Sequence, residues 1–144
     1  MNLKSNLIAV ILLLTYSGAM AQGNDLVGTW CLDIHKAIDV MAPANKNHYD
    51  TLSAKIKELA VSRMNGREFI FSQNGEITVN WKSRRGQEVS KGQWEKDEPQ
   101  GKISITINSQ ASVYDYEFLS VGVLIMRMEN KQGFFDNLYL EKIN

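Results

Sequence analysis

From Arg67 onward, short runs of strand-forming residues alternate with turns rich in Gly, Asn and Ser. Both prolines, Pro43 and Pro99, fall outside these runs. Evenly spaced short strands separated by such turns predict an antiparallel sandwich or barrel. An earlier run brings the predicted strands to eight, enough to close a barrel without free edges. In chain order the runs are LVGTWCLDI, REFIFSQ, EITVNWK, QEVSKGQWEK, KISITIN, ASVYDYEFL, VLIMRME and FFDNLYLEKI.

The hairpin around Asn74-Gly75 predicts which side chains face the core. A two-residue Asn-Gly loop would divide the apolar side chains between the two faces of the sheet. A loop of Gln73, Asn74 and Gly75, with Gly75 in the left-handed conformation, gathers them on one face. Because a slip of one residue turns every side chain over, burial favours this longer loop. The resulting face carries Phe69, Phe71, Ile77, Val79 and Trp81, with Arg67 opposite Trp81.

Tyr49–Gly66 predicts a helix between the first two strands. Leu52, Ile56 and Leu59 recur at helical spacing, which is typical of a helix with one apolar stripe. Asp50 is the expected cap of the first turn, and Asn65-Gly66 is the expected stop signal. A short helical turn is also expected around residues 38–41.

The N-terminus has the pattern of a secretory signal peptide. Lys4 precedes the apolar run LIAVILLL, and small residues follow up to Ala21. The run is too short to span about 30 Å of hydrocarbon, so no integral membrane segment is expected after cleavage. Cys31 lies too far downstream for a lipoprotein. We therefore expect a signal peptide at residues 1–21, one domain at residues 22–144, and a periplasmic or secreted protein.

Charge offers no sign of a nucleic-acid partner. The formal net charge is 0, so no long-range field favours a polyanion. Lys82–Arg85 is a basic cluster, interpreted as a solvated turn between two strands. We expect a monomer.

Catalytic and metal-binding residues do not form a recognisable set. Cys31, Asp33 and His35 alternate on the predicted first strand and could ligate a metal, but no second cluster completes a ligand set. Nothing in the sequence positions a histidine for a catalytic triad. We expect no enzymatic activity, no metal and no cofactor.

Several motifs resemble the small bacterial lipocalin-like domain family of the calycin superfamily. They are Gly28-x-Trp30, the FIFSQNGEI hairpin, Gly92-x-Trp94 and the closing LYLEKI, which together span nearly all of residues 22–144. The resemblance implies an all-β fold, an eight-stranded antiparallel up-and-down lipocalin-like β-barrel. Here one α-helix is inserted between strands one and two, whereas in lipocalins the helix follows the eighth strand.

The same resemblance implies that Trp30 packs across the closed end of the barrel, beneath Arg127 or Lys142. We expect Gly28, Trp30 and Arg127 to form this structural plug. The barrel interior is the expected ligand site, and its expected partner is a small hydrophobic molecule. Its lining is predicted to be Phe69, Phe71, Trp81, Trp94, Tyr114, Tyr116, Phe118 and Met126.

Two functions remain open from the sequence. An open barrel indicates a carrier of a small hydrophobic molecule. A barrel filled by its own side chains indicates instead a protein-interaction or inhibitory module. That second reading predicts an exposed apolar patch involving Ile70, Ile125 or Tyr139.

Overall fold

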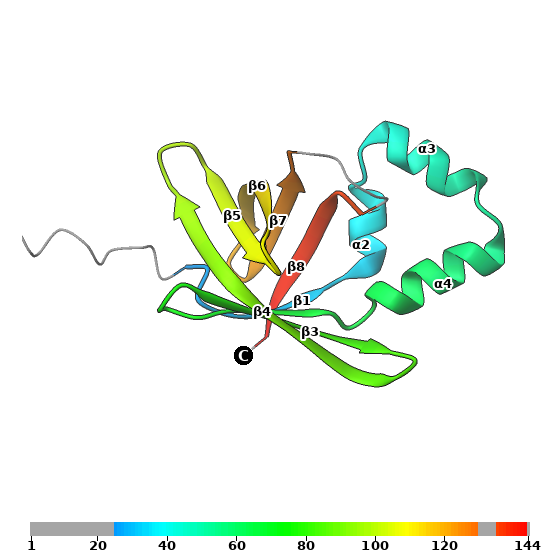
Figure 1. Cartoon of the computed structure of the whole chain (residues 1–144). Helices are drawn as coiled ribbons and strands as arrows, with labels where there is room; N and C mark the ends of the chain where they lie inside the picture. The colour runs from blue at the N-terminus through cyan, green and yellow to red at the C-terminus, as the bar shows by residue number, and fades with distance from the viewer. Residues whose placement is uncertain (1–24, 130–134, 144) are drawn as a thin grey trace, which may run out of the picture.

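The chain folds into a closed antiparallel barrel of eight strands, β1 to β8 (Figure 1). The computed structural model describes residues 25–129 and 135–143, so the expected signal peptide lies outside the described residues. Each strand pairs with the next one along the chain, and β1 pairs with β8 to close the barrel. The eight-stranded antiparallel barrel is therefore confirmed. The strands are β1 Gly28–Leu32, β2 Glu68–Phe71, β3 Glu76–Ser83, β4 Gly86–Asp97, β5 Lys102–Ile107, β6 Gln110–Ser120, β7 Val123–Met128 and β8 Asn137–Ile143.

The predicted register of the β2–β3 hairpin is correct. Phe71 pairs with Ile77, and Phe69 pairs with Val79. Gly75 has a φ of 85°, the left-handed conformation that closes a three-residue loop with little strain. Burial of one apolar face has thus selected the register.

Strand β4 pairs with two neighbouring strands at Gly92. Gly92 pairs with Ile77 on β3 and with Ile107 on β5. A Cβ atom at this position would lie 2.0 Å from the backbone oxygen of Thr106. Glycine is required here because the two strands approach too closely for any side chain.

Three helices lie between β1 and β2, where the sequence predicted one helix and a turn. They are α2 Ile34–Asp39, α3 Pro43–Thr51 and α4 Ala54–Met64. The predicted single helix Tyr49–Gly66 is divided because Leu52 and Ser53 adopt extended backbone conformations. Ser53, not Asp50, caps α4, and its hydroxyl accepts a hydrogen bond from the Ile56 N–H. Figure 1 shows α3 and α4 forming an arc beside the barrel, with α2 next to β8.

Strand β1 ends earlier than predicted. Asp33 caps α2 by accepting a hydrogen bond from the Lys36 N–H at 3.1 Å. His35 is therefore helical and exposed, so Cys31, Asp33 and His35 do not alternate on one strand face. Ile34 is a buried core residue, but it belongs to α2 and not to the first strand. A short polar side chain before a helical run can stop a strand because its carboxylate satisfies a free N–H of the first turn.

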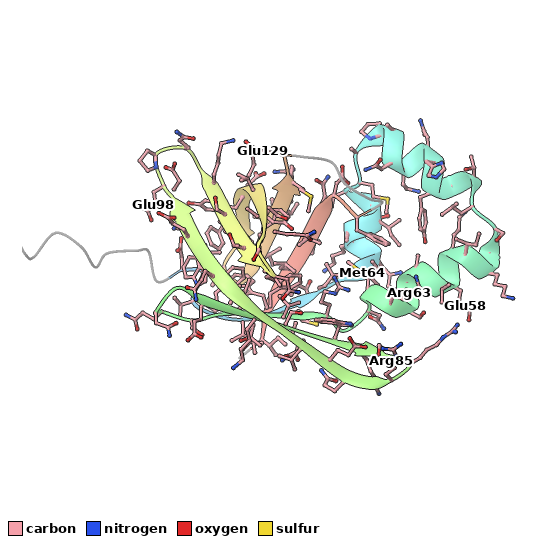
Figure 2. The ribbon with its side chains drawn as sticks, in the orientation of Figure 1. Glu58, Arg63, Met64, Arg85, Glu98 and Glu129 are labelled. Carbon is pink, nitrogen blue, oxygen red and sulfur yellow. The ribbon has the colours of Figure 1, made fainter. Side chains whose placement is uncertain are left out.

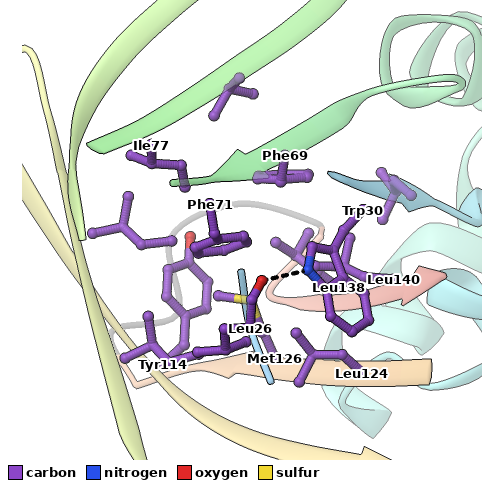
Figure 3. Packing of buried hydrophobic residues seen from close by; sticks show 14 of the residues in the cluster. Leu26, Trp30, Phe69, Phe71, Ile77, Tyr114, Leu124, Met126, Leu138 and Leu140 are labelled. Atoms are coloured by element: carbon purple, nitrogen blue, oxygen red, sulfur yellow. Dashed lines mark hydrogen bonds between the residues drawn. The ribbon is translucent and has the colours of Figure 1, made fainter. Parts of the chain in front are cut away.

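The core lies inside the barrel, where Figure 3 shows part of it, and it includes Ile34 and Ala37 of α2. In β8 the inward side chains are Leu138 and Leu140. Ile125, predicted for an exposed patch, is only 3% exposed. Among the described residues, no helix is long and apolar enough to cross a bilayer.

Candidate functional site

Trp30 seals one end of the barrel. Its indole is 1% exposed, and its Nε1 donates a 2.7 Å hydrogen bond to the backbone oxygen of Leu26 (Figure 3). The Nζ of Lys142 lies 5.3 Å above the ring, within the range of a cation–π contact. Gly28 makes room for this lysine, because a Cβ atom there would lie 2.7 Å from the Lys142 Cε. Gly28, Trp30 and Lys142 therefore form the plug.

Arg127 does not take part in this plug, contrary to the prediction. Its guanidinium is paired with Glu117 at 3.0 Å on the outer surface. Register explains the difference. Arg127 pairs with Asn137, near the start of β8, while Lys142 pairs directly with Trp30. Of the two basic residues that the resemblance implied, Lys142 is the one that packs on Trp30.

Buried side chains occupy the middle of the barrel. Phe71 and Trp94 meet edge to face, with ring centroids 5.4 Å apart. The Trp94 Nε1 donates a 3.0 Å hydrogen bond to the Ser72 backbone oxygen, which ties β4 to the β2–β3 loop. Met126 and Ile77 are fully buried beside them. The predicted lining residues Phe71, Trp94 and Met126 are thus core residues here.

Tyr116 and Phe118 belong to the sealed end as well. Phe118 lies 6.1 Å from the Trp30 ring, and Tyr116 lies 6.0 Å from Phe118, centroid to centroid. The Lys96 Nζ lies 5.3 Å from the Tyr116 ring and is held between Asp25 and Glu98 at 2.9 Å each. These contacts stabilise the rim and leave neither ring lining the cavity described next.

The opposite end of the barrel holds a cavity of about 290 Å³. Phe69 and Tyr114, two of the predicted lining residues, lie on its wall. Met64 contributes from the end of α4. The polar lining is sparse and belongs mainly to the β5–β6 hairpin. The remaining apolar lining residues are Val79, Ile105, Ile107, Met128, Phe135 and Leu138.

Trp81 lies outside this cavity, in a groove of about 570 Å³ between α4 and the β3–β4 hairpin. Figure 2 shows Arg63 on α4 facing the hairpin that carries Arg85. Lys82 and Arg84 also line the groove, and Glu88 is the acidic residue among its lining. The Lys82–Arg85 cluster is therefore part of a concave cationic surface, in addition to being a turn.

Arg67 lines both the cavity and the groove. Its guanidinium carbon lies 5.6 Å from the Trp81 ring centroid, and its Nε is buried without a hydrogen-bond partner among the described residues. The sequence analysis placed Arg67 opposite Trp81 but gave it no role. The sequence did place Arg67 on the same strand face as Phe69 and Phe71. A charged residue on an inward face is rarely buried unless it is paired, so this position could have indicated a binding role for Arg67.

Burial perturbs two groups at this end of the barrel. Burial lowers the pKa of Arg67, partly opposed by Tyr114, yet a guanidinium remains charged at neutral pH. Burial raises the pKa of Tyr114 against the opposing effects of Ser112 and Arg67. Tyr114 is thus a neutral hydroxyl beside a fixed positive charge.

Cys31 is half-buried on β1 and carries a free thiol. Burial raises its pKa, and the charges of Glu68, Glu141 and Asp33 raise it further. The described residues contain no group of His, Cys, Asp and Glu side chains that could hold a metal ion.

Comparison with protein-family models, with curated proteins and with solved structures yields no significant match for this chain.

Proposed function

We propose that this protein is an exported, non-catalytic binding protein that holds a small hydrophobic molecule in the cavity at the open end of its barrel. The cavity carries the proposal. Its walls are mostly apolar, with a few polar groups at one side, as in small-molecule sites generally. An up-and-down meander with a helical insertion after β1 and a Gly28-x-Trp30 plug supports placing it with the lipocalin-like proteins.

The size of the cavity limits the ligand. At about 290 Å³ it lies at the lower end of the roughly 300–1,000 Å³ found for ligand sites. The middle of the barrel adds no room to this cavity, because Phe71, Trp94 and Met126 are buried in the core there. A single short chain or a compact aromatic molecule of two or three rings fits, and a large lipid does not.

Binding of a neutral apolar probe tests this function. N-phenylnaphthylamine is expected to become fluorescent with saturable binding to the protein and to be displaced by decanol. A Val79→Trp variant fills the cavity from its wall and should abolish binding. Thr78→Trp, on the adjacent outward position of β3, is the matched control and should bind normally. Equal binding by all three proteins, or by none, rules the cavity out as the site.

Export is tested separately. N-terminal sequencing of protein recovered from its host is expected to begin at Gln22, after cleavage behind Ala21. An intact N-terminus in the cytoplasm would contradict this part of the proposal.

A second candidate function, the protein-interaction module, is favoured by one observation. Large apolar side chains are exposed close to the sealed end, with Leu119 at 48%, Val121 at 104% and Ile143 at 43% exposure. Ile70, Ile125 and Tyr139, the positions predicted from the sequence, are not among the exposed large apolar residues. Val121→Asp should abolish capture of a protein partner from host extract if this surface is used, while Val79→Trp should leave capture intact.

A further inference from the structure

The charge beside the cavity is not neutralised by the surrounding protein. Arg67 has no ion pair with a described residue, and its Nε lacks a hydrogen-bond partner there. Its contact with Trp81 is a ring face at 5.6 Å, which leaves the N–H groups of the guanidinium unsatisfied by that ring. Arg67 is partly buried, and a buried N–H of a charged group without a hydrogen-bond partner is costly, so the site gains if an anion supplies one.

The surroundings of Arg67 are built to attract an anion. Arg63, Lys82, Arg84 and Arg85 line the same groove, against one acidic residue, Glu88. These four side chains are exposed, and their fields add within a concave surface. A guanidinium also matches the planar geometry of a carboxylate and can bind it through two parallel N–H donors.

Arg67 lines the apolar cavity as well as the cationic groove. A molecule that fits both has an apolar part and an anionic group. We propose that the ligand is an amphipathic anion whose charged group binds Arg67 at the groove between α4 and the β3–β4 hairpin, with its apolar part in the barrel cavity. This inference rests on the proposed binding function and adds the class of ligand. Trp81 lies against the same guanidinium, so its fluorescence is a local reporter of binding.

Three probes with the same tail test the inference: decanoate, decyl sulfate and decanol. Affinities are measured by displacement of N-phenylnaphthylamine and by calorimetry at low ionic strength. Both anions are expected to bind at least about tenfold more tightly than decanol, since a hydrogen bond to a charged group contributes roughly that much. The tighter of the two anions indicates whether a planar or a tetrahedral head group is preferred.

The decisive variant is Arg67→Gln, with Arg127→Gln as the control that removes an equal charge from the outer wall. Arg67→Gln is expected to weaken decanoate roughly ten- to hundredfold and to leave decanol within about twofold. Arg127→Gln should change neither. Circular dichroism and the midpoint of thermal unfolding establish that both variants fold. A second variant, Arg84→Gln with Arg85→Gln, should weaken the anions by a smaller factor and reduce their salt dependence.

The outcomes separate the two proposals. If decanol binds but decanoate and decyl sulfate bind no better, or if Arg67→Gln weakens decanol and decanoate equally, the anion inference is wrong and the hydrophobic site stands. If none of the three displaces the fluorescent probe and the probe itself does not bind, the proposed function fails and the inference fails with it.

Discussion

At the scale of single residues, Trp30 joins three interactions that do not depend on a ligand. Its ring is buried, its Nε1 is bonded to the Leu26 backbone, and Lys142 lies over it. Trp30→Ala should lower the free energy of unfolding by about 3–5 kcal/mol, measured by chemical denaturation. Lys142→Met, which keeps the aliphatic stem and removes the cation–π contact, should cost only about 0.5–1 kcal/mol. A larger loss for Lys142→Met than for Trp30→Ala would contradict the plug.

Cys31 gives a second prediction at this scale. Because burial and three nearby carboxylates raise its pKa, its thiol should react more slowly with iodoacetamide in the folded protein than in guanidinium at the same pH. The folded state binds the proton more tightly than the unfolded state, whose thiol has a pKa of about 8.5. Stability should therefore fall as pH rises above that value. In Cys31→Ala this part of the decline should be absent, which denaturation at two pH values can establish.

At the scale of elements, the pairing of β4 with β5 depends on the absence of a side chain at Gly92. An added methyl group would meet the Thr106 oxygen at 2.0 Å, and backbone cannot rotate away as a side chain can. Gly92→Ala should cost about 3 kcal/mol or more, at or above the upper end for overpacking. Gly66→Ala is the comparison. Gly66 has a φ of 70° and open space around it. Gly66→Ala should therefore lower the free energy of unfolding by about 1–2 kcal/mol, through the backbone conformation alone. Equal costs for the two variants would show that space at Gly92 is not limiting.

Elements with local determinants were predictable from sequence. The loop that ends at Gly75 and the facing of Phe69 and Phe71 follow from alternation and one turn residue, and both are correct. The helical region was predictable as helical but not in its divisions. Ser53 and Asp50 are equally good caps in sequence, and only the packed structure selects Ser53. The sequence pattern likewise placed Asp33 within the first strand, whereas in the structure it caps α2.

The candidate site was less predictable because it depends on how opposite walls of the barrel meet. Tyr114 and Phe118 alternate identically along β6, yet one lines a cavity and the other packs near Trp30. Their difference is depth along the barrel axis, which strand periodicity does not encode. Arg67 was missed for the same reason, since its burial arises from α4 and the β3–β4 hairpin together.

At the scale of the whole molecule, the barrel has a packed half and an open half. Ile77 and Val79 lie on the same face of β3. Ile77 is in the packed half, and Val79 lines the cavity in the open half. Ile77→Phe should cost about 1–3 kcal/mol by overpacking. Val79→Phe, growing into existing space, should cost less than about 1 kcal/mol and should reduce binding of the neutral probe. Thermal unfolding of the two variants compares them directly, and equal losses would mean that the cavity is not open in solution.

The pairing of β1 with β8 also determines how the chain acquires its structure. Trp30 pairs with Lys142 across almost the full length of the domain, so the ring of hydrogen bonds cannot close until the final strand is present. Contacts of such long sequence separation place the protein among slow folders, in the millisecond-to-second range. Before closure, β1 and β7 each expose a free edge that can pair with other chains. Protection from aggregation therefore comes last, with the docking of Leu138 and Leu140.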